Sequence, residues 1–304
     1  MRFRCALVIR VIRNFVRHNG GMRDAQGDEA DDAVNNSSEP SESRNVGEGS
    51  GLPGRHDSAT RMNGAEGLIG RESDVIPGRF GDPLEVTHAE WSQDGGKRNE
   101  KRPLFLLLHG WGSSAADMRE FFAGYVSPFS DYVALQAPLH LPGYPAAGTW
   151  FHDCVPAGED LDRDAFAAAS AIDRWVAANV PADRKVIPLG FSQGGLLAVH
   201  LLRVDPQRYA AAVTLSGFLA PGVVPGTAPG DEELAQLDTS VFYGVGLADT
   251  CIPRYEAKAF AAWLEEHTYL KMCEYPGLDH SICIDEVDDL REWLVGIGAD
   301  SGLR

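Results

Sequence analysis

Ser192 has the clearest chemical signature in the chain, because it stands at the centre of a G-x-S-x-G pattern formed by residues 190–194. An apolar run at 186–189 precedes the pattern and another at 196–202 follows it, as a strand and a buried helix would. On such a strand–turn–helix the serine sits on a strained turn, and its hydroxyl projects out of the sheet. The flanking glycines allow both the turn and the close packing of the helix behind it. The sequence therefore predicts a nucleophilic serine.

A nucleophilic serine needs a histidine to take its proton and a carboxylate to orient that histidine. With this kind of turn, the chain order is serine, then acid, then histidine. Asp249 and His280 fit that order, and each follows an apolar run that is expected to be a strand. The histidines before Ser192 break the order, while His200 and His267 fall inside predicted helices. Asp249 and His280 are therefore the expected acid and base.

The negative charge that develops on an attacked carbonyl oxygen is stabilised by two backbone N–H donors. One is expected from Gln193, the residue after the nucleophile, and the other from a loop after an earlier strand. Residues 106–113, Leu-Leu-Leu-His-Gly-Trp-Gly-Ser, supply that loop, and Trp111 is the expected second donor. A plain turn is the alternative interpretation of His109-Gly110.

The elements that must position these residues alternate between strand and helix from residue 82 onward. The predicted strands are 84–91, 104–108, 132–136, 185–189, 210–215, 241–245 and 269–275, and the predicted helices are 163–179, 193–204, 253–267 and 285–295. This alternation favours the α/β class, with a mostly parallel central sheet flanked by helices. Ligands of such sheets bind beyond the carboxyl ends of the strands, where Asp249 and His280 are expected.

The composition excludes several classes of function. The formal net charge is −17, and the expected folded part after residue 80 is acidic, whereas binding to nucleic-acid phosphates calls for clustered Lys and Arg, so no nucleic-acid partner is expected. The five cysteines follow no zinc spacing, which favours free thiols in a reducing cytoplasm and no structural metal. No apolar run approaches the roughly 18 residues of a transmembrane helix.

The N-terminal residues 1–80 differ from the remainder, which predicts a catalytic domain at 81–304. Residues 21–78 are rich in Gly, Ser, Asn, Asp and Glu, and they are expected to be disordered because they cannot bury enough apolar surface. Residues 1–20 mix arginine with apolar residues, so a basic amphipathic helix that targets the protein or contacts a membrane surface is one interpretation. We favour the other, an upstream start codon or an unstructured extension.

Together these motifs resemble the phospholipase/carboxylesterase family of α/β-hydrolases, which includes the acyl-protein thioesterases, through nearly all of residues 82–295. The matching segments are 107–110, 136–138, 150–152, 190–195 and 215–217. The resemblance implies an α/β-hydrolase fold without a large lid domain, a two-step acyl-enzyme hydrolysis and no cofactor. It also places Trp150 and Phe151 at the substrate pocket.

Two departures from the family pattern leave the substrate class open. Tyr243-Gly244 stands where many members have His-Gly, and His152-Asp153 displaces an expected aspartate by one residue. The leading hypothesis is a serine hydrolase that cleaves small-molecule carboxylic esters or thioesters. A lysophospholipase-like activity on longer acyl chains and a catalytically silent binding protein are the alternatives. The sequence leaves both a monomer and a homodimer open.

Overall fold

The computed structural model describes residues 83–154 and 156–301. The predictions for residues 1–80, disorder and a basic amphipathic helix, lie outside the described residues. Among the helices that are described, none has the length and apolar character needed to cross a membrane.

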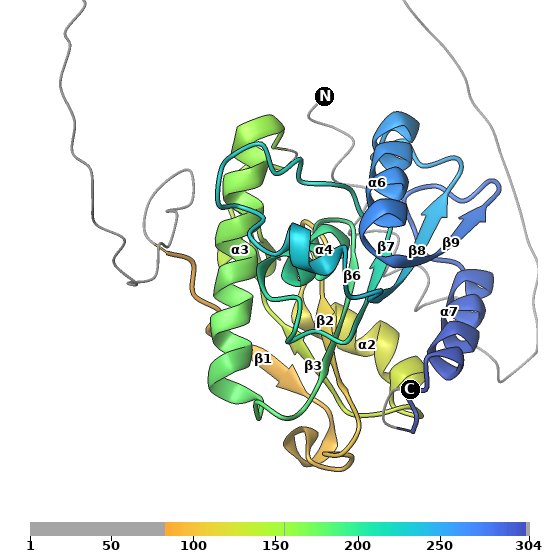
Figure 1. Ribbon diagram of the computed structural model, residues 1–304. Helices are drawn as coiled ribbons and strands as arrows, with labels where there is room; N and C mark the ends of the chain where they lie inside the picture. The colour runs from red at the N-terminus through yellow and green to blue at the C-terminus, as the bar shows by residue number, and fades with distance from the viewer. Residues whose placement is uncertain (1–82, 155, 302–304) are drawn as a thin grey trace, which may run out of the picture. The chain divides into compact units, whose positions relative to one another are not determined.

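A seven-stranded sheet forms the centre of the described fold (Figure 1). The strands are β1 (Ala89–Trp91), β2 (Leu104–Leu108), β3 (Tyr132–Leu135), β6 (Val186–Phe191), β7 (Ala211–Leu215), β8 (Ser240–Gly246) and β9 (Tyr269–Tyr275). Their order is β1-β3-β2-β6-β7-β8-β9, and every neighbouring pair is parallel except β1 with β3. Because the parallel strands end at one edge, the loops that follow β2, β6, β8 and β9 meet there.

Helices cover both faces of this sheet, as the sequence predicted. They are α2 (Ala115–Val126), α3 (Gly158–Asn179), α4 (Gln193–Val204), α5 (Asp231–Leu234), α6 (Arg254–His267) and α7 (Ile284–Gly296), with a 3₁₀ turn η2 (Gln93–Gly96). Leu104, Leu106 and Leu108 of β2 pack in one apolar cluster with α3, α4 and α6. Phe105 and Leu107 point to the opposite face, into a cluster with α2 and α7. Burial on both faces explains why β2 reads as an unbroken apolar run.

Two elements near the site are absent from the sequence prediction, helix α2 and a hairpin of β4 (Leu139–Leu141) and β5 (Tyr144–Thr149). The start of α2 carries a readable signal, because the Ser114 side chain accepts a hydrogen bond from the Asp117 backbone N–H. The hairpin is harder to read, since Pro145 lies inside β5 and weakens the strand pattern. No separate lid domain occurs within residues 83–154 and 156–301.

The two largest differences between predicted and observed boundaries are at the starts of α3 and β1. Helix α3 begins at Gly158 rather than at 163, and Glu159 and Asp160 occupy its first turn, where the helix dipole favours negative charge. Strand β1 begins at Ala89 rather than at 84. The preceding segment instead packs Leu84 against the α3 side of the core, and the Arg174 side chain donates a hydrogen bond to the Leu84 carbonyl.

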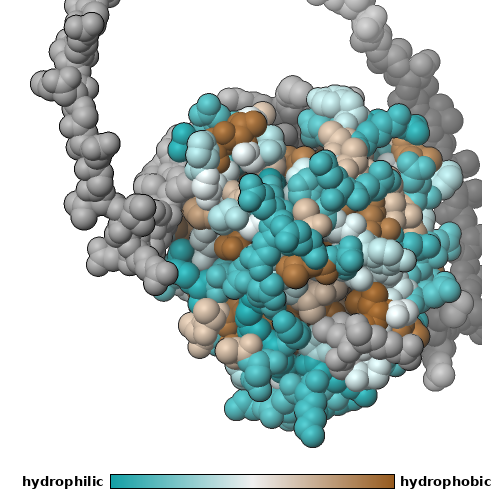
Figure 2. Space-filling view, in the orientation of Figure 1, coloured by the Kyte–Doolittle hydropathy of each residue, from teal (hydrophilic) through white to brown (hydrophobic). Residues whose placement is uncertain are grey.

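The surface over α3, α4 and α6 is chemically mixed. Figure 2 shows brown apolar side chains there in small groups separated by teal polar ones. Scattered apolar side chains of this kind are ordinary on protein surfaces, so this face by itself marks no interaction site.

Candidate active site

Ser192 lies on the sharp turn between β6 and α4, as its motif predicts. Its backbone has φ 57° and ψ −117°, a conformation that a residue with a side chain adopts only at a cost of about 1–3 kcal/mol. The glycines on either side allow the backbone segments to pack closely. A Cβ atom at Gly194 would overlap the Leu108 carbonyl oxygen of β2, and one at Gly190 would overlap the Gly194 carbonyl oxygen. This tight packing holds the serine at the carboxyl edge of the sheet.

The structure brings Ser192, Asp249 and His280 together in one hydrogen-bonded chain. The Ser192 hydroxyl donates to Nε2 of His280 over 3.0 Å, and Nδ1–H of His280 donates to the Asp249 carboxylate over 2.7 Å. Only 5% of the His280 side chain and 2% of the Asp249 side chain are exposed, so water competes little for these bonds. The carboxylate can only accept, which fixes the proton on Nδ1 and leaves the Nε2 lone pair facing the serine.

The surroundings of Asp249 keep its carboxyl group ionised. Burial alone would raise the pKa of Asp249, but the hydrogen bond and charge of His280 lower it. The backbone N–H groups of Cys251 and Ile252 also donate to the carboxylate, over 2.8 and 2.9 Å, and the net result is a pKa below the usual value. An ionised acid in this position can stabilise a protonated His280.

The loop that carries Asp249 and the loop that carries His280 are hydrogen-bonded to each other. The Ala248 backbone N–H donates to the Leu278 carbonyl over 2.9 Å, and Gly246 lies so close to that carbonyl that a Cβ atom there would overlap it. The ring of His280 also packs on Phe191 with centroids 4.8 Å apart. These contacts hold the imidazole beside the serine without help from a ligand.

The expected oxyanion donors lie on the two segments that flank Ser192. Gln193 is the first residue of α4, and Trp111 lies in the loop after β2. That loop touches the nucleophile, since a Cβ atom on Gly110 would be 3.2 Å from the Ser192 Cβ atom. Within the described residues, neither the Trp111 nor the Gln193 backbone N–H donates a hydrogen bond. The role of these two N–H groups as oxyanion donors stays a prediction.

His109 is a supporting residue whose role the sequence did not indicate. Burial lowers the pKa of His109 to about 4, so its ring is neutral at physiological pH. Its Nδ1–H donates to the Gly110 carbonyl over 2.7 Å, and its Nε2 accepts from the Ala137 backbone N–H over 3.0 Å. The ring thus fixes the loop that carries Trp111.

Trp150 and Phe151, expected at the substrate pocket, are both fully buried in this structure. The Trp150 indole N–H donates to the His109 carbonyl over 2.8 Å, and its backbone N–H donates to the Gln193 side-chain oxygen over 3.2 Å. The contacts of Trp150 support the loop after β2 and the turn at Ser192, and both side chains are fully buried, so neither presents a surface to an open groove. A pocket-lining role for these two residues stays a prediction.

The two departures from the family pattern have structural partners. His152 pairs through Nδ1 with the buried Asp164 carboxylate at 3.0 Å. The buried Tyr243 ring packs on Phe260, with centroids 5.0 Å apart, and its hydroxyl donates to the Gly217 carbonyl over 3.4 Å. These contacts show how the chain accommodates both residues, but they do not identify a substrate.

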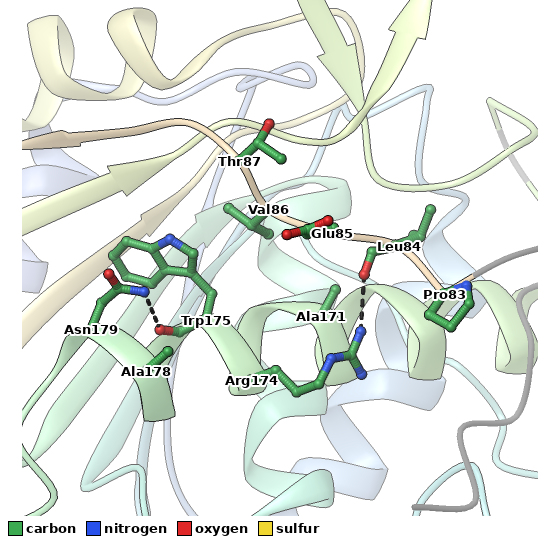
Figure 3. A pocket seen from close by; sticks show the side chains of 10 residues that line it. All are labelled: Pro83, Leu84, Glu85, Val86, Thr87, Ala171, Arg174, Trp175, Ala178 and Asn179. Atoms are coloured by element: carbon green, nitrogen blue, oxygen red, sulfur yellow. Dashed lines mark hydrogen bonds between the residues drawn. The ribbon is translucent and has the colours of Figure 1, made fainter.

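A cavity of about 620 Å³ lies elsewhere, between the segment at residues 83–87 and α3 (Figure 3). Arg174 and Trp175 of α3 line one side of it. None of its lining residues belongs to the hydrogen-bonded chain or to the two oxyanion segments. We therefore assign it no part in the chemistry.

Comparisons with known proteins identify the family and the fold of this chain. Residues 95–296 match the family described as Phospholipase/Carboxylesterase. Acyl-protein thioesterase 1 of Saccharomyces cerevisiae is 27% identical over 212 residues, which cover 64% of this chain and 92% of that protein. A probable carboxylesterase of Oryza sativa subsp. japonica is 26% identical over 212 residues, covering 64% of this chain and 77% of that protein.

Solved structures share the fold. Esterase PE8 superposes with a TM-score of 0.55 at 23% identity, covering 71% of this chain and 100% of that one. Zea mays acyl-protein thioesterase 2 also has a TM-score of 0.55, at 19% identity, covering 69% of this chain and 98% of that one. These likenesses confirm the expected α/β-hydrolase fold. Because the family match extends over more than half of the sequence, the chain belongs to the phospholipase/carboxylesterase family of hydrolases.

Proposed function

We propose that this protein hydrolyses carboxylic esters or thioesters through an acyl-enzyme, with Ser192 as nucleophile, His280 as base and Asp249 as the acid that orients it. The observation that carries the proposal is the continuous hydrogen-bonded chain from the Ser192 hydroxyl through His280 to Asp249. The same three residues stand in the order that this fold requires.

In the first step, the Ser192 oxygen attacks the acyl carbonyl while its proton passes to Nε2 of His280. Asp249 stabilises the imidazolium that forms. The backbone N–H groups of Gln193 and Trp111 bind the resulting oxyanion. His280 then returns the proton to the departing alcohol or thiol, and the acyl group remains on Ser192. In the second step, water attacks the acyl-enzyme with His280 again as base, which releases the carboxylic acid and regenerates Ser192.

The relatives support an acyl substrate. The similar proteins from yeast and rice are named an acyl-protein thioesterase and a probable carboxylesterase. We accordingly propose esters and thioesters of acyl groups as the substrate class.

The four cysteines of the described part, Cys154, Cys251, Cys273 and Cys283, form no disulfide. A cytoplasmic location and a homodimer stay predictions.

The test combines covalent labelling with turnover. A fluorophosphonate should label the wild-type protein at Ser192, and Ser192→Ala should lose both the label and about 10⁶-fold in turnover of p-nitrophenyl esters. Equal turnover by the alanine variant would refute the mechanism. A series of esters from acetyl to palmitoyl, with a matched acyl thioester, then separates the substrate classes. Activity that rises with chain length would favour the lysophospholipase-like alternative, whereas no label and no turnover would favour a silent binding protein.

A further inference from the structure

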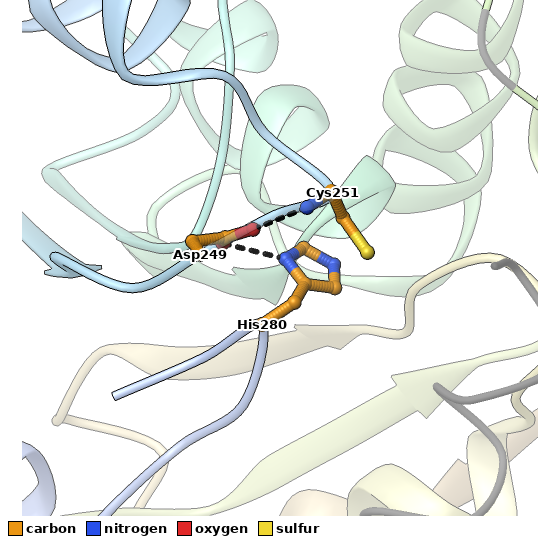
Figure 4. A group of neighbouring side chains, drawn as sticks. All are labelled: Asp249, Cys251 and His280. Carbon is orange, nitrogen blue, oxygen red and sulfur yellow. Dashed lines mark hydrogen bonds and ion pairs between the residues drawn. The ribbon is translucent and has the colours of Figure 1, made fainter. Parts of the chain in front are cut away.

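Cys251 brings a thiol to the edge of the candidate active site. It follows Asp249 by two residues, and its half-buried side chain turns toward His280 (Figure 4). One donor atom each of Asp249, Cys251 and His280 lie within 4.8 Å of one another, the one such group among the described residues. In Figure 4 the sulfur lies on the side of the imidazole ring away from the Asp249 carboxylate. The mechanism above gives the Cys251 thiol no task.

These three donors suit a thiophilic divalent cation. Thiolate sulfur and imidazole nitrogen are the preferred ligands of Zn²⁺, at about 2.3 and 2.0–2.1 Å, so two such donors on one tetrahedral ion lie about 3.5 Å apart. The three donor atoms now lie within 4.8 Å of one another, so binding requires the Cys251 sulfur and Nε2 of His280 to come to about 3.5 Å. The Asp249 carboxylate and the Cys251 thiolate together offset the charge of a divalent ion, so the occupied site carries no net charge.

Asp249 already has the arrangement that a metal-bound histidine uses. A histidine that binds a metal through one ring nitrogen commonly donates its other N–H to a carboxylate, which fixes the tautomer and makes the ligand more basic. Nδ1–H of His280 makes that bond to Asp249, and the Nε2 lone pair points outward at Ser192. The imidazole that can take a proton from Ser192 is therefore also prepared to bind a metal.

We propose that Cys251 and Nε2 of His280, oriented by Asp249, form an inhibitory binding site for Zn²⁺ or a similar thiophilic cation. Binding forms a metal–sulfur and a metal–nitrogen bond and releases the thiol proton of Cys251 to solvent. Nε2 then has no lone pair left to accept the Ser192 proton. The inhibition, but not the metal binding, rests on the proposed hydrolase function.

Metal binding can be tested without any turnover by titrating the full chain with Co²⁺ and recording thiolate-to-cobalt charge-transfer absorption. The wild type and Ser192→Ala should both show the band, because the serine is not a ligand. Cys251→Ser and Cys251→Ala should both lose it. The control is Cys283→Ser, which changes another half-buried thiol at the start of α7, where serine is a favoured N-cap. This control should keep the band. A band that survives both Cys251 substitutions would overturn the site.

Inhibition is tested separately with Zn²⁺, each variant being compared with its own rate in the presence of a chelator. Cys251→Ser should need at least about tenfold more Zn²⁺ for half inhibition than the wild type, since losing even an outer partner of a metal ligand costs 10–100-fold in affinity. Equal inhibition of the two proteins would refute a role for Cys251. A cobalt band without any ester turnover would keep the metal site and reject the hydrolase proposal. Turnover without a band would do the reverse.

Discussion

Glu286, in the first turn of α7, is a carboxyl group buried inside the fold, and replacing it by glutamine should change how stability depends on pH. The side chain is 1% exposed, and neither carboxyl oxygen makes a hydrogen bond within the described residues. Burial raises the pKa of Glu286 to about 8, the nearby Cys283 backbone N–H opposes this, and the charge of Asp289 adds to it. The carboxyl fits only because Gly244 of β8 has no side chain to overlap it.

The sign of the effect follows from proton binding. Between pH 4.5 and about 8 the folded protein keeps the Glu286 proton while the unfolded chain loses it, so this group lowers the free energy of unfolding as the pH rises. The slope is about 1.4 kcal/mol per pH unit. Across the whole interval from 4.5 to about 8, the loss accumulates to about 5 kcal/mol. Below pH 4.5 both states carry the proton, and the destabilisation disappears.

Glu286→Gln keeps the shape of the side chain and removes the titration. Urea unfolding of the wild type and the variant at pH 5, 6, 7 and 8 gives the difference in unfolding free energy at each pH. The unfolding free energy of the variant minus that of the wild type should increase by about 1.4 kcal/mol per pH unit. Any effect of the amide that does not depend on pH adds the same amount at every pH. Glu292→Gln, an exposed position on the same helix, controls for the loss of one negative charge. A difference that stays flat from pH 5 to 8 would refute the buried-carboxyl argument.

Three further substitutions test other parts of the structure. Asp249→Asn should lower kcat by about 10⁴-fold in steady-state ester hydrolysis, because an amide favours the wrong tautomer of His280, and a loss under tenfold would contradict the role of the acid. Arg184→Leu should cost about 3–5 kcal/mol in urea unfolding, since it leaves Asp131, its buried partner at 3.0 Å, without a positive charge; an unchanged midpoint would count against this. Gly244→Ala should destabilise by about 1–3 kcal/mol through overlap with the α7 carboxyl, and a neutral result by the same measurement would show that this packing relaxes.

The sequence was most informative where structure is local. The G-x-S-x-G pattern predicted the turn at Ser192. The apolar run at 104–108 predicted both ends of β2, because all five residues of this strand are buried and the strand therefore coincides with the apolar run. The hairpin β4–β5 escaped prediction, since its strands are short and Pro145 breaks the pattern. Its position matters to the candidate site, because the Gly112 backbone N–H of the loop after β2 donates to the Gly148 carbonyl near the end of the hairpin over 2.9 Å.

The α/β class, the turn at Ser192 and the order of the candidate catalytic residues can be predicted from the sequence, because each depends on periodicity or on the order of residues along the chain. Which side chains touch depends on how the whole chain folds. His280 reaches Ser192 across 88 residues and Asp249 across 31, because parallel strands deliver their loops to one edge of the sheet. The same convergence sets the Cys251 thiol beside the imidazole, where no metal-ligand spacing in the sequence marks it. The fold also buries Trp150 beneath the loop after β2, where its indole N–H donates to the His109 carbonyl and its ring packs on the His109 ring. These two contacts depend on where the backbone places both residues, so the residue types alone do not predict them.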